Sequence, residues 1–411
     1  METLRITRLG SGGEGIADHL ARRVEVPFAL PGETVTARIE GDRALSVSLL
    51  QTSRDRTAPP CPHFGRCGGC AAQHMATGLY REWKRSLVDV AIAGRGPIAG
   101  VRDMIDAHGD GRRRVAIHVR KERDPLAGFM AVRSHHLVDI DRCPLLVGSL
   151  ADAFSAARAL AGLVHGRVAF DLHLTAAENG IDADLRGLER ESRLAADAVA
   201  TVARAHRLIR VGRHGDVLYQ SERPFVTCGR VRVEFPPGAF LQATAAAEQV
   251  IADLILGHAA RARRVADLFC GIGPFALRLA GRAPVSAFDA DRGAIAALAS
   301  AVARTPGLKP VSAAVRDLFR NPLTGAELEG VDTVIVNPPR QGAEAQCRQL
   351  AGTGVRTVIM VSCNPATFAR DADILARGGY RLEEVTPVDQ FRWSPHVELV
   401  ALFVKPPGRR A

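Results

Sequence analysis

Hydrophobic and polar residues are spaced differently in the two halves of the chain. Residues 1–53 hold short apolar runs separated by glycine-rich turns, which is typical of a small OB-like β-barrel. From about residue 229, near-continuous apolar runs alternate with helical segments, at 265–270, 285–290, 331–339, 355–363 and 397–405. Strands of this kind are buried on both faces, so this half predicts an α/β fold with a doubly wound, mostly parallel sheet. Ligands bind beyond the carboxyl ends of such strands.

Three parts follow from this pattern: the barrel (1–53), a central α+β region (54–228) and the α/β domain (229–411). The central region begins with a polar, proline-rich linker and a helix expected at about 78–92. Residues 112–120 alternate between apolar and basic side chains, which indicates a half-buried strand with a basic face. Such a face is typical either of a solvated sheet edge or of a surface that contacts RNA.

A strand, a glycine turn and a helix follow one another in VADLFCGIGPFALRLA. Gly271 and Gly273 allow the backbone to approach a ligand closely. The next strand ends at Asp289, whose carboxylate is placed to accept ribose hydroxyls. The third glycine of a dinucleotide turn is replaced by Ala276, which leaves NAD as a less favoured alternative. Asp317, after a further strand, is expected either to accept an adenine amino group or to cap a helix.

Two more strand ends carry residues that can act on a base. Asn337 follows an apolar strand in VNPPRQG with Arg340 nearby, and its amide can read the edge of a planar ring such as uracil. Cys363 follows the next strand, just before a predicted helix. A helix N-terminus lowers a thiol pKa, which favours a nucleophile, although an isolated cysteine is more often a buried core residue. Cys228, Cys270 and Cys347 lack this context and are expected to be structural.

His396 and Glu398 stand where the last strand begins, and alternate residues of a strand share a face. A charged pair at such a place is usually solvated. Beside a reactive cysteine, however, Glu398 becomes a candidate general base.

Three cysteines lie close together in CPHFGRCGGC, and a fourth precedes Pro144; they are Cys61, Cys67, Cys70 and Cys143. Thiols in this arrangement commonly bind a metal. The spacing by itself favours tetrahedral zinc over a four-iron cluster.

The formal net charge of +10 and the pI near 9.7 favour a polyanionic partner. Arginine dominates the basic residues, so part of this charge can reflect composition rather than RNA binding. No apolar run of about 18 residues and no N-terminal signal core are present, and we expect a cytoplasmic protein without membrane association.

The motifs DLFCGIGPFAL, VNPPRQG, VSCNPATFARD and HVELV, in this order, resemble the RNA 5-methyluridine (uracil-C5) methyltransferase family. The resemblance implies a class I methyltransferase domain, S-adenosylmethionine as cofactor, Cys363 as nucleophile and Glu398 as general base. It places Gln242 of AFLQAT in the active site with Phe240 beside it. The residues that we expect around the cofactor and the target base are Gln242, Phe269, Gly271, Gly273, Asp289, Asp317 and Asn337.

The same resemblance implies further partners. Family members with this cysteine spacing carry a [4Fe-4S] cluster, which assigns Cys61, Cys67, Cys70 and Cys143 as its ligands. The N-terminal barrel is similar to the TRAM domain, an RNA-binding module. We expect an enzyme that acts as a monomer on 23S ribosomal RNA rather than on transfer RNA.

Two residues depart from the family pattern. Asn337 stands where an aspartate is usual, and Pro274 stands where a polar residue is usual. Two other functions remain open from the sequence alone. An amino-group methyltransferase would use the Asn-Pro-Pro turn without Cys363 or Glu398, and an iron–sulfur RNA-binding protein would have an inactive transferase domain.

Overall fold

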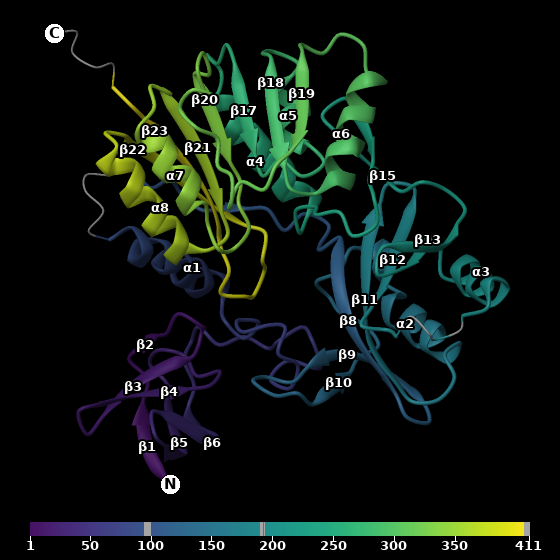
Figure 1. The fold of residues 1–411 in the computed structure, drawn as a ribbon. Helices are drawn as coiled ribbons and strands as arrows, with labels where there is room; N and C mark the ends of the chain where they lie inside the picture. The colour runs from purple at the N-terminus through teal and green to yellow at the C-terminus, as the bar shows by residue number, and fades with distance from the viewer. Residues whose placement is uncertain (94–99, 190–191, 193, 407–411) are drawn as a thin grey trace.

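The computed structural model describes residues 1–406 except 94–99, 190–191 and 193 (Figure 1). Its N-terminal part is a curled six-stranded sheet in the order β1-β5-β6-β4-β3-β2, with alternate apolar residues such as Leu4, Val24 and Val35 buried inside. The predicted OB-like barrel is therefore confirmed. Its strands are β1 (Glu2–Arg5), β2 (Arg8–Leu9), β3 (Gly15–His19), β4 (Arg22–Val26), β5 (Thr34–Glu40) and β6 (Arg43–Gln51).

The central region contains a seven-stranded sheet in the order β10-β9-β8-β11-β12-β13-β14, with two helices packed on one face (Figure 1). The basic strand predicted near residues 112–120 is β8, and it pairs with β9 on one side and β11 on the other. The interpretation as a sheet edge was therefore wrong. The elements are β8 (Arg114–Lys121), β9 (Pro125–Met130), β10 (Leu137–Asp139), η1 (Gly148–Leu150), α2 (Ala153–Gly162), β11 (Val168–Ala177), β12 (Gly180–Arg186), α3 (Ala196–Ala205), β13 (Leu208–Arg213) and β14 (Asp216–Gln220).

The C-terminal half forms an eight-stranded sheet in the order β19-β18-β17-β20-β21-β23-β22-β7. The strands from β19 to β21 are parallel, and β23 runs antiparallel to its two neighbours, as the predicted mostly parallel sheet requires. Its strands are β7 (Ile105–Asp106), β17 (Val265–Leu268), β18 (Val285–Asp289), β19 (Val311–Val315), β20 (Thr333–Val336), β21 (Thr357–Ser362), β22 (Arg381–Asp389) and β23 (Glu398–Val404).

Helices cover both faces of this sheet, so the apolar strands are buried as their composition predicts. One face packs against α4 (Ala245–His258), α5 (Pro274–Leu279) and α6 (Arg292–Ala303), and the other against α1 (Thr77–Ile92), α7 (Glu344–Ala351) and α8 (Pro365–Arg377) (Figure 1). A separate hairpin, β15 (Phe225–Cys228) with β16 (Val231–Glu234), precedes α4.

Helix α1 and strand β7 belong to this α/β domain, although the sequence assigns them to the central region. Val88 and Ile92 of α1 enter the core beneath the sheet. Lys84, on the same helix, is fully buried and pairs with Asp389 at 2.8 Å. Its Nζ also donates to the carbonyl of Ser394 (2.9 Å). A single lysine thereby anchors the segment that joins β22 to β23.

Candidate active site

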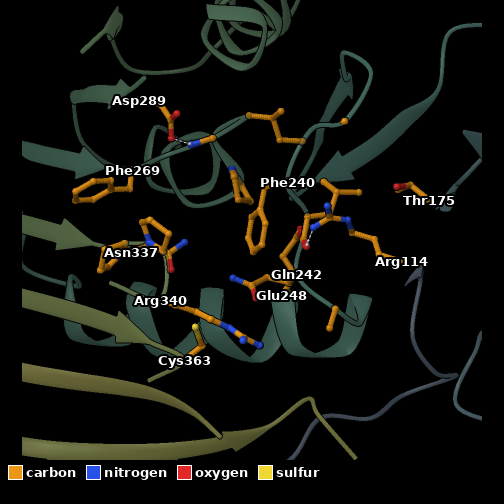
Figure 2. A pocket seen from close by; sticks show the side chains of 18 of the residues that line it. Arg114, Thr175, Phe240, Gln242, Glu248, Phe269, Asp289, Asn337, Arg340 and Cys363 are labelled. Carbon is orange, nitrogen blue, oxygen red and sulfur yellow. Dashed lines mark hydrogen bonds between the residues drawn. The ribbon is translucent and has the colours of Figure 1, made fainter. Parts of the chain in front are cut away.

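The carboxyl ends of the parallel strands meet the central sheet at a cavity of about 700 Å³ (Figure 2). Residues that follow β17, β18, β20 and β21 line it on one side, and residues of β8, β11 and β12 line it on the other. The cavity thus occupies the place where parallel α/β sheets bind ligands.

In the part of the chain that the structure describes, no helix is long and apolar enough to cross a membrane.

The turn after β17 requires glycine at two positions because of its backbone conformation. Gly271 and Gly273 have φ of 54° and 82°, in the left-handed region that suits glycine. Gly273 also sits against Leu298, where an added Cβ would come within 2.5 Å of a methyl group. Pro274 occupies the start of α5, where no backbone donor is needed. Gly271 lines the cavity, whereas Gly273 supports the turn from behind.

Asp289 ends β18 and faces the same turn. Its Oδ2 accepts the Gly271 N–H at 2.8 Å, and its Oδ1 accepts the Asp291 N–H at 2.9 Å. Each carboxylate oxygen keeps a free lone pair, so both can still accept ribose hydroxyls. The rings of Phe269 and Phe319 pack at 5.1 Å between centroids, tilted by 46°, and supply an apolar wall. These residues fit an adenosine group.

Asp317 is not among the residues that line the cavity. Its Oδ1 accepts the N–H groups of Phe319 (3.0 Å) and Arg320 (3.3 Å), and its side chain is 44% exposed. No helix follows Asp317, because residues 318–320 form a turn; the carboxylate closes this turn, and the predicted helix cap is wrong. An adenine contact by Asp317 stays a prediction.

Cys363 follows β21 and lines the cavity, and Asn364 caps α8 behind it. The expected lowering of the thiol pKa is wrong. Burial raises the pKa of Cys363, and the nearby Glu398 carboxylate raises it further. The Arg340 guanidinium opposes both effects and lowers the pKa. Figure 2 shows the Arg340 side chain beside the sulfur. Arg340 is thus the group that favours a thiolate here.

Glu398 is the first residue of β23 and is only 4% exposed. Burial raises the pKa of its carboxyl to about 7. His396 was expected to share a face with Glu398, but it lies before the strand and does not line the cavity; its ring packs against Phe391, with 5.8 Å between the ring centroids. Of these two residues, only Glu398 lines the cavity, and the pKa of its carboxyl suits it to accept a proton near neutral pH.

Gln242 lines the cavity from the segment before α4. Two arginines of the central region hold the backbone of that segment: Arg113 donates to the Gln242 carbonyl (3.0 Å) and Arg114 to the Leu241 carbonyl (2.9 Å). Phe240 is 61% exposed, and the Arg114 guanidinium lies 5.1 Å from its ring. The exposed ring offers a face on which a base can stack.

Asn337 and Arg340 lie at the end of β20 and reach the cavity, as predicted (Figure 2). The Arg340 carbonyl accepts from Asn364 Nδ2 at 3.0 Å, which joins the turn after β20 to the turn after β21. No hydrogen-bond partner of the Asn337 side-chain amide is found among the described residues. Its amide can therefore present either its donor or its acceptor to a ligand.

Sequence reasoning missed Gln390. This buried residue follows β22 and donates to both Gln242 (2.9 Å) and Glu398 (2.7 Å). Its position after a buried strand is the signal that applies to Asn337 and Cys363. It was overlooked because RLEEVTPVD, the sequence of β22, lacks a regular apolar pattern.

The four cysteines of the predicted cluster are free thiols in one neighbourhood of the central region. Burial raises the pKa of Cys70 to about 12, with smaller contributions from Cys143, Cys67 and Cys61. The Gly68 N–H donates to the Met130 carbonyl (2.9 Å), which ties this segment to β9. Four thiols near one another are the donors that a cluster requires. Across the described residues, no group of three or more cysteine, histidine or acidic side chains is arranged to hold a metal ion.

The remaining three cysteines match their structural assignment, since Cys228, Cys270 and Cys347 are all buried. Cys270 also touches the cavity wall.

Fold and cavity together define a class I methyltransferase domain that is joined to an N-terminal barrel and a central α+β region. In structure, the chain resembles a tRNA (uracil-54, C5)-methyltransferase of Pyrococcus abyssi, with a TM-score of 0.76, 22% identity and coverage of 98% of this chain and all of the other. Two family models match: "tRNA (Uracil-5-)-methyltransferase" over residues 309–405 and "Methyltransferase small domain" over residues 238–354.

Sequence relatives cover nearly the whole chain. An RNA methyltransferase of Brucella melitensis that is described as uncharacterized is 42% identical over 98% of this chain and 97% of its own length. A 23S rRNA (uracil(1939)-C(5))-methyltransferase of Chromohalobacter salexigens is 35% identical over 99% of this chain and 90% of its own. The chain belongs to the RNA uracil-C5 methyltransferase family and is an S-adenosylmethionine-dependent RNA methyltransferase.

Proposed function

We propose that this enzyme methylates carbon 5 of a uridine in large-subunit ribosomal RNA, with Cys363 as covalent nucleophile and Glu398 as general base. The observation that carries the proposal is the convergence of Cys363, Glu398 and Gln242 on one cavity beside the glycine turn. An amino-group methyltransferase needs neither the thiol nor the buried carboxyl.

The chemistry uses each of these groups. Carbon 5 of uracil is a weak nucleophile. When the Cys363 thiolate bonds to C6, the C5=C6 electron pair moves toward the C4 carbonyl and produces an enolate. Carbon 5 then attacks the sulfonium methyl, and the S–CH3 bond breaks to release S-adenosylhomocysteine. Glu398 removes the C5 proton, the C5=C6 bond re-forms, and the thiolate leaves.

S-adenosylmethionine supplies the electrophilic methyl group when it is bound. Asp289 and the Gly271 turn would hold its ribose, and the Phe269 ring would pack beside the adenosine. The target base must leave its stack to reach Cys363. Phe240 and Arg114, at the opposite wall, offer a stacking surface and a positive charge for the RNA near that base.

The choice of ribosomal RNA is supported by the relative from Chromohalobacter salexigens, a 23S rRNA methyltransferase that is 35% identical to this chain. The matching family model instead names transfer RNA, so the target needs a direct test. We further propose that Cys61, Cys67, Cys70 and Cys143 bind a [4Fe-4S] cluster, that the barrel is a TRAM domain, and that the enzyme works as a cytoplasmic monomer.

Mapping 5-methyluridine in cellular RNA, with and without the gene for this chain, tests the proposal. We expect one uridine of large-subunit ribosomal RNA to lose its methyl group in the deleted strain. Restoration by the wild-type gene, but not by a Cys363→Ala gene, ties the loss to this active site. An unchanged 5-methyluridine map contradicts the proposal.

A further inference from the structure

The side-chain amide of Gln390 joins two residues that face the cavity. Its Nε2 donates to Oε1 of Gln242 at 2.9 Å and to Oε2 of Glu398 at 2.7 Å. Its Oε1 accepts the backbone N–H of Ala243 at 2.9 Å. Gln242, Gln390 and Glu398 are each 4% exposed, so water competes little for these bonds.

The backbone fixes the direction of these hydrogen bonds. A peptide N–H can only donate, so the atom of Gln390 that faces Ala243 is the oxygen. The nitrogen of Gln390 therefore faces Gln242, and Gln242 must meet it with its own oxygen. The NH2 group of Gln242 is left without a hydrogen-bond partner among the residues that the structure describes, and this side chain lines the cavity.

We propose, building on the proposed function, that Gln390 is a positioning residue that fixes Gln242 as a hydrogen-bond donor to O4 of the target uracil. Uracil presents an oxygen acceptor at this position, whereas cytosine presents an amino donor. A donor held toward this position binds uracil and repels cytosine. Asn337 cannot make this distinction, because its amide is free to turn.

The contact with O4, rather than with O2, follows from Glu398. This carboxylate must reach the proton on C5, and C5 is bonded to the carbon that carries O4. Gln390 bonds to both Glu398 and Gln242, so these two side chains lie side by side. The carbonyl next to C5 is therefore the one within reach of Gln242, while O2 lies across the ring.

The same hydrogen bond assists the reaction. Addition of the Cys363 thiolate to C6 moves negative charge onto O4. A donor that is already in place strengthens its hydrogen bond as this charge develops, which lowers the barrier. Gln390 thus links base selection to catalysis through one side-chain amide.

Thio-substituted substrates test the contact without any change in the protein. The probe is a synthetic RNA fragment around the mapped uridine, with that uridine replaced by 4-thiouridine or by 2-thiouridine. Sulfur accepts hydrogen bonds weakly, so we expect the 4-thio fragment to lose roughly 10- to 100-fold in kcat, because a hydrogen bond to a charged acceptor is lost. The 2-thio fragment should lose less than about threefold, within the range of a weak neutral contact.

A variant separates positioning from folding. Gln390→Met keeps the volume but removes both donors, so the Gln242 amide is free to turn. We expect kcat on the uridine fragment to fall with little change in KM. The loss in kcat when the target uridine is replaced by 4-thiouridine, called the 4-thio penalty, should shrink to less than about threefold. Gln346→Met is the matched control, since Gln346 is also a buried glutamine, and its amide bonds to Leu323 alone among the residues that the structure describes. It should keep the full 4-thio penalty.

Each outcome bears on a separate claim. Absence of methyl transfer to the uridine fragment by the parent enzyme contradicts the proposed function. Transfer with a larger penalty for 2-thiouridine than for 4-thiouridine overturns the assignment of O4. An unchanged 4-thio penalty in Gln390→Met overturns the role of Gln390, and the measurements on the parent enzyme remain decisive if that variant does not fold.

Discussion

At the scale of single residues, the pKa of the Cys363 thiol depends on its burial and on the charged side chains around it. Burial and Glu398 raise the pKa of Cys363, and Arg340 lowers it. We expect Cys363→Ala to lose methyl transfer by on the order of 10³-fold or more, because no covalent adduct forms. RNA with 5-fluorouridine at the target should trap the parent enzyme covalently, since C5 then carries no removable proton. Denaturing electrophoresis detects that complex.

Cys347→Ala is the matched control for this experiment, because Cys347 is a buried thiol outside the cavity. It should lose some stability and retain activity. Activity retained by Cys363→Ala would favour the amino-group mechanism instead.

The role of Glu398 as general base predicts how a substitution and a change in pH affect turnover. Glu398→Gln should still form the bond between Cys363 and C6 but stall before proton loss, so a denaturation-resistant adduct accumulates and turnover falls about 10²- to 10⁴-fold. The pKa of Glu398 is raised to about 7, and the base must be ionised. Turnover should therefore decline as the pH falls through about 7. A rate that is flat between pH 6 and 8 would contradict this role.

At the scale of elements, the sequence could predict the functional residues that lie at the ends of apolar strands. Asp289 ends an apolar strand and Asn337 and Cys363 each follow one, and such strand ends lie at one edge of a parallel sheet. This logic located the glycine turn and several of the residues that line the cavity.

Contacts between distant segments could not be predicted in the same way. Lys84 has the pattern of a solvated helix residue, yet it is buried because Asp389, about 300 positions later, pairs with it. The same limit applies to Cys363, because the sequence shows the helix that follows it but not the burial that outweighs the helix. Strand β8 was ambiguous because strands are assigned to an edge or an interior only once their neighbours are known.

The glycine turn between β17 and α5 supports a prediction at this scale. Alanine at either Gly271 or Gly273 adds left-handed backbone strain of about 1–2 kcal/mol. At Gly273 the new methyl also meets Leu298, whereas at Gly271 it meets open space. We expect Gly273→Ala to lower the free energy of unfolding by about 1–3 kcal/mol more than Gly271→Ala. Urea denaturation of both proteins measures the difference, and equal losses would refute the role of Leu298.

The three parts of the molecule are joined by packing. Trp83 of α1 donates to the carbonyl of Gly10 in the barrel (2.9 Å), and it packs with Leu30 and Tyr80. The cysteine segment, residues 61–70, lies between the barrel and the central sheet (Figure 1). The Gly68 N–H ties it to β9. A change in this segment therefore acts on the barrel and the central sheet before it acts on the glycine turn.

We expect protein purified without oxygen to be brown, with iron and acid-labile sulfide near about four per chain. Cys67→Ser should lose the colour and weaken RNA binding or folding, while S-adenosylmethionine still binds with nearly the parent Kd. The Cys347→Ala protein should keep its iron. One zinc per chain without visible absorption would contradict the cluster and favour the tetrahedral alternative.

The choice between ribosomal and transfer RNA belongs to the whole molecule. A catalytic domain alone can grip a compact stem-loop, whereas a segment of a large RNA needs further backbone contacts while its base is flipped out. The candidates for such contacts in this chain are the barrel and the wall of central-sheet residues that faces the active site, including Arg114 and Arg186, and the net charge of +10 favours a polyanionic partner. We therefore expect methyl transfer to an unmodified large-subunit fragment to exceed transfer to unmodified transfer RNA by at least about tenfold, at equal salt concentration. Counting radioactive methyl groups in each RNA measures the ratio, with Cys363→Ala as the background. Preferential methylation of the transfer RNA would overturn the substrate assignment and leave the covalent mechanism standing, because the reacting groups of the cavity would be the same for either RNA.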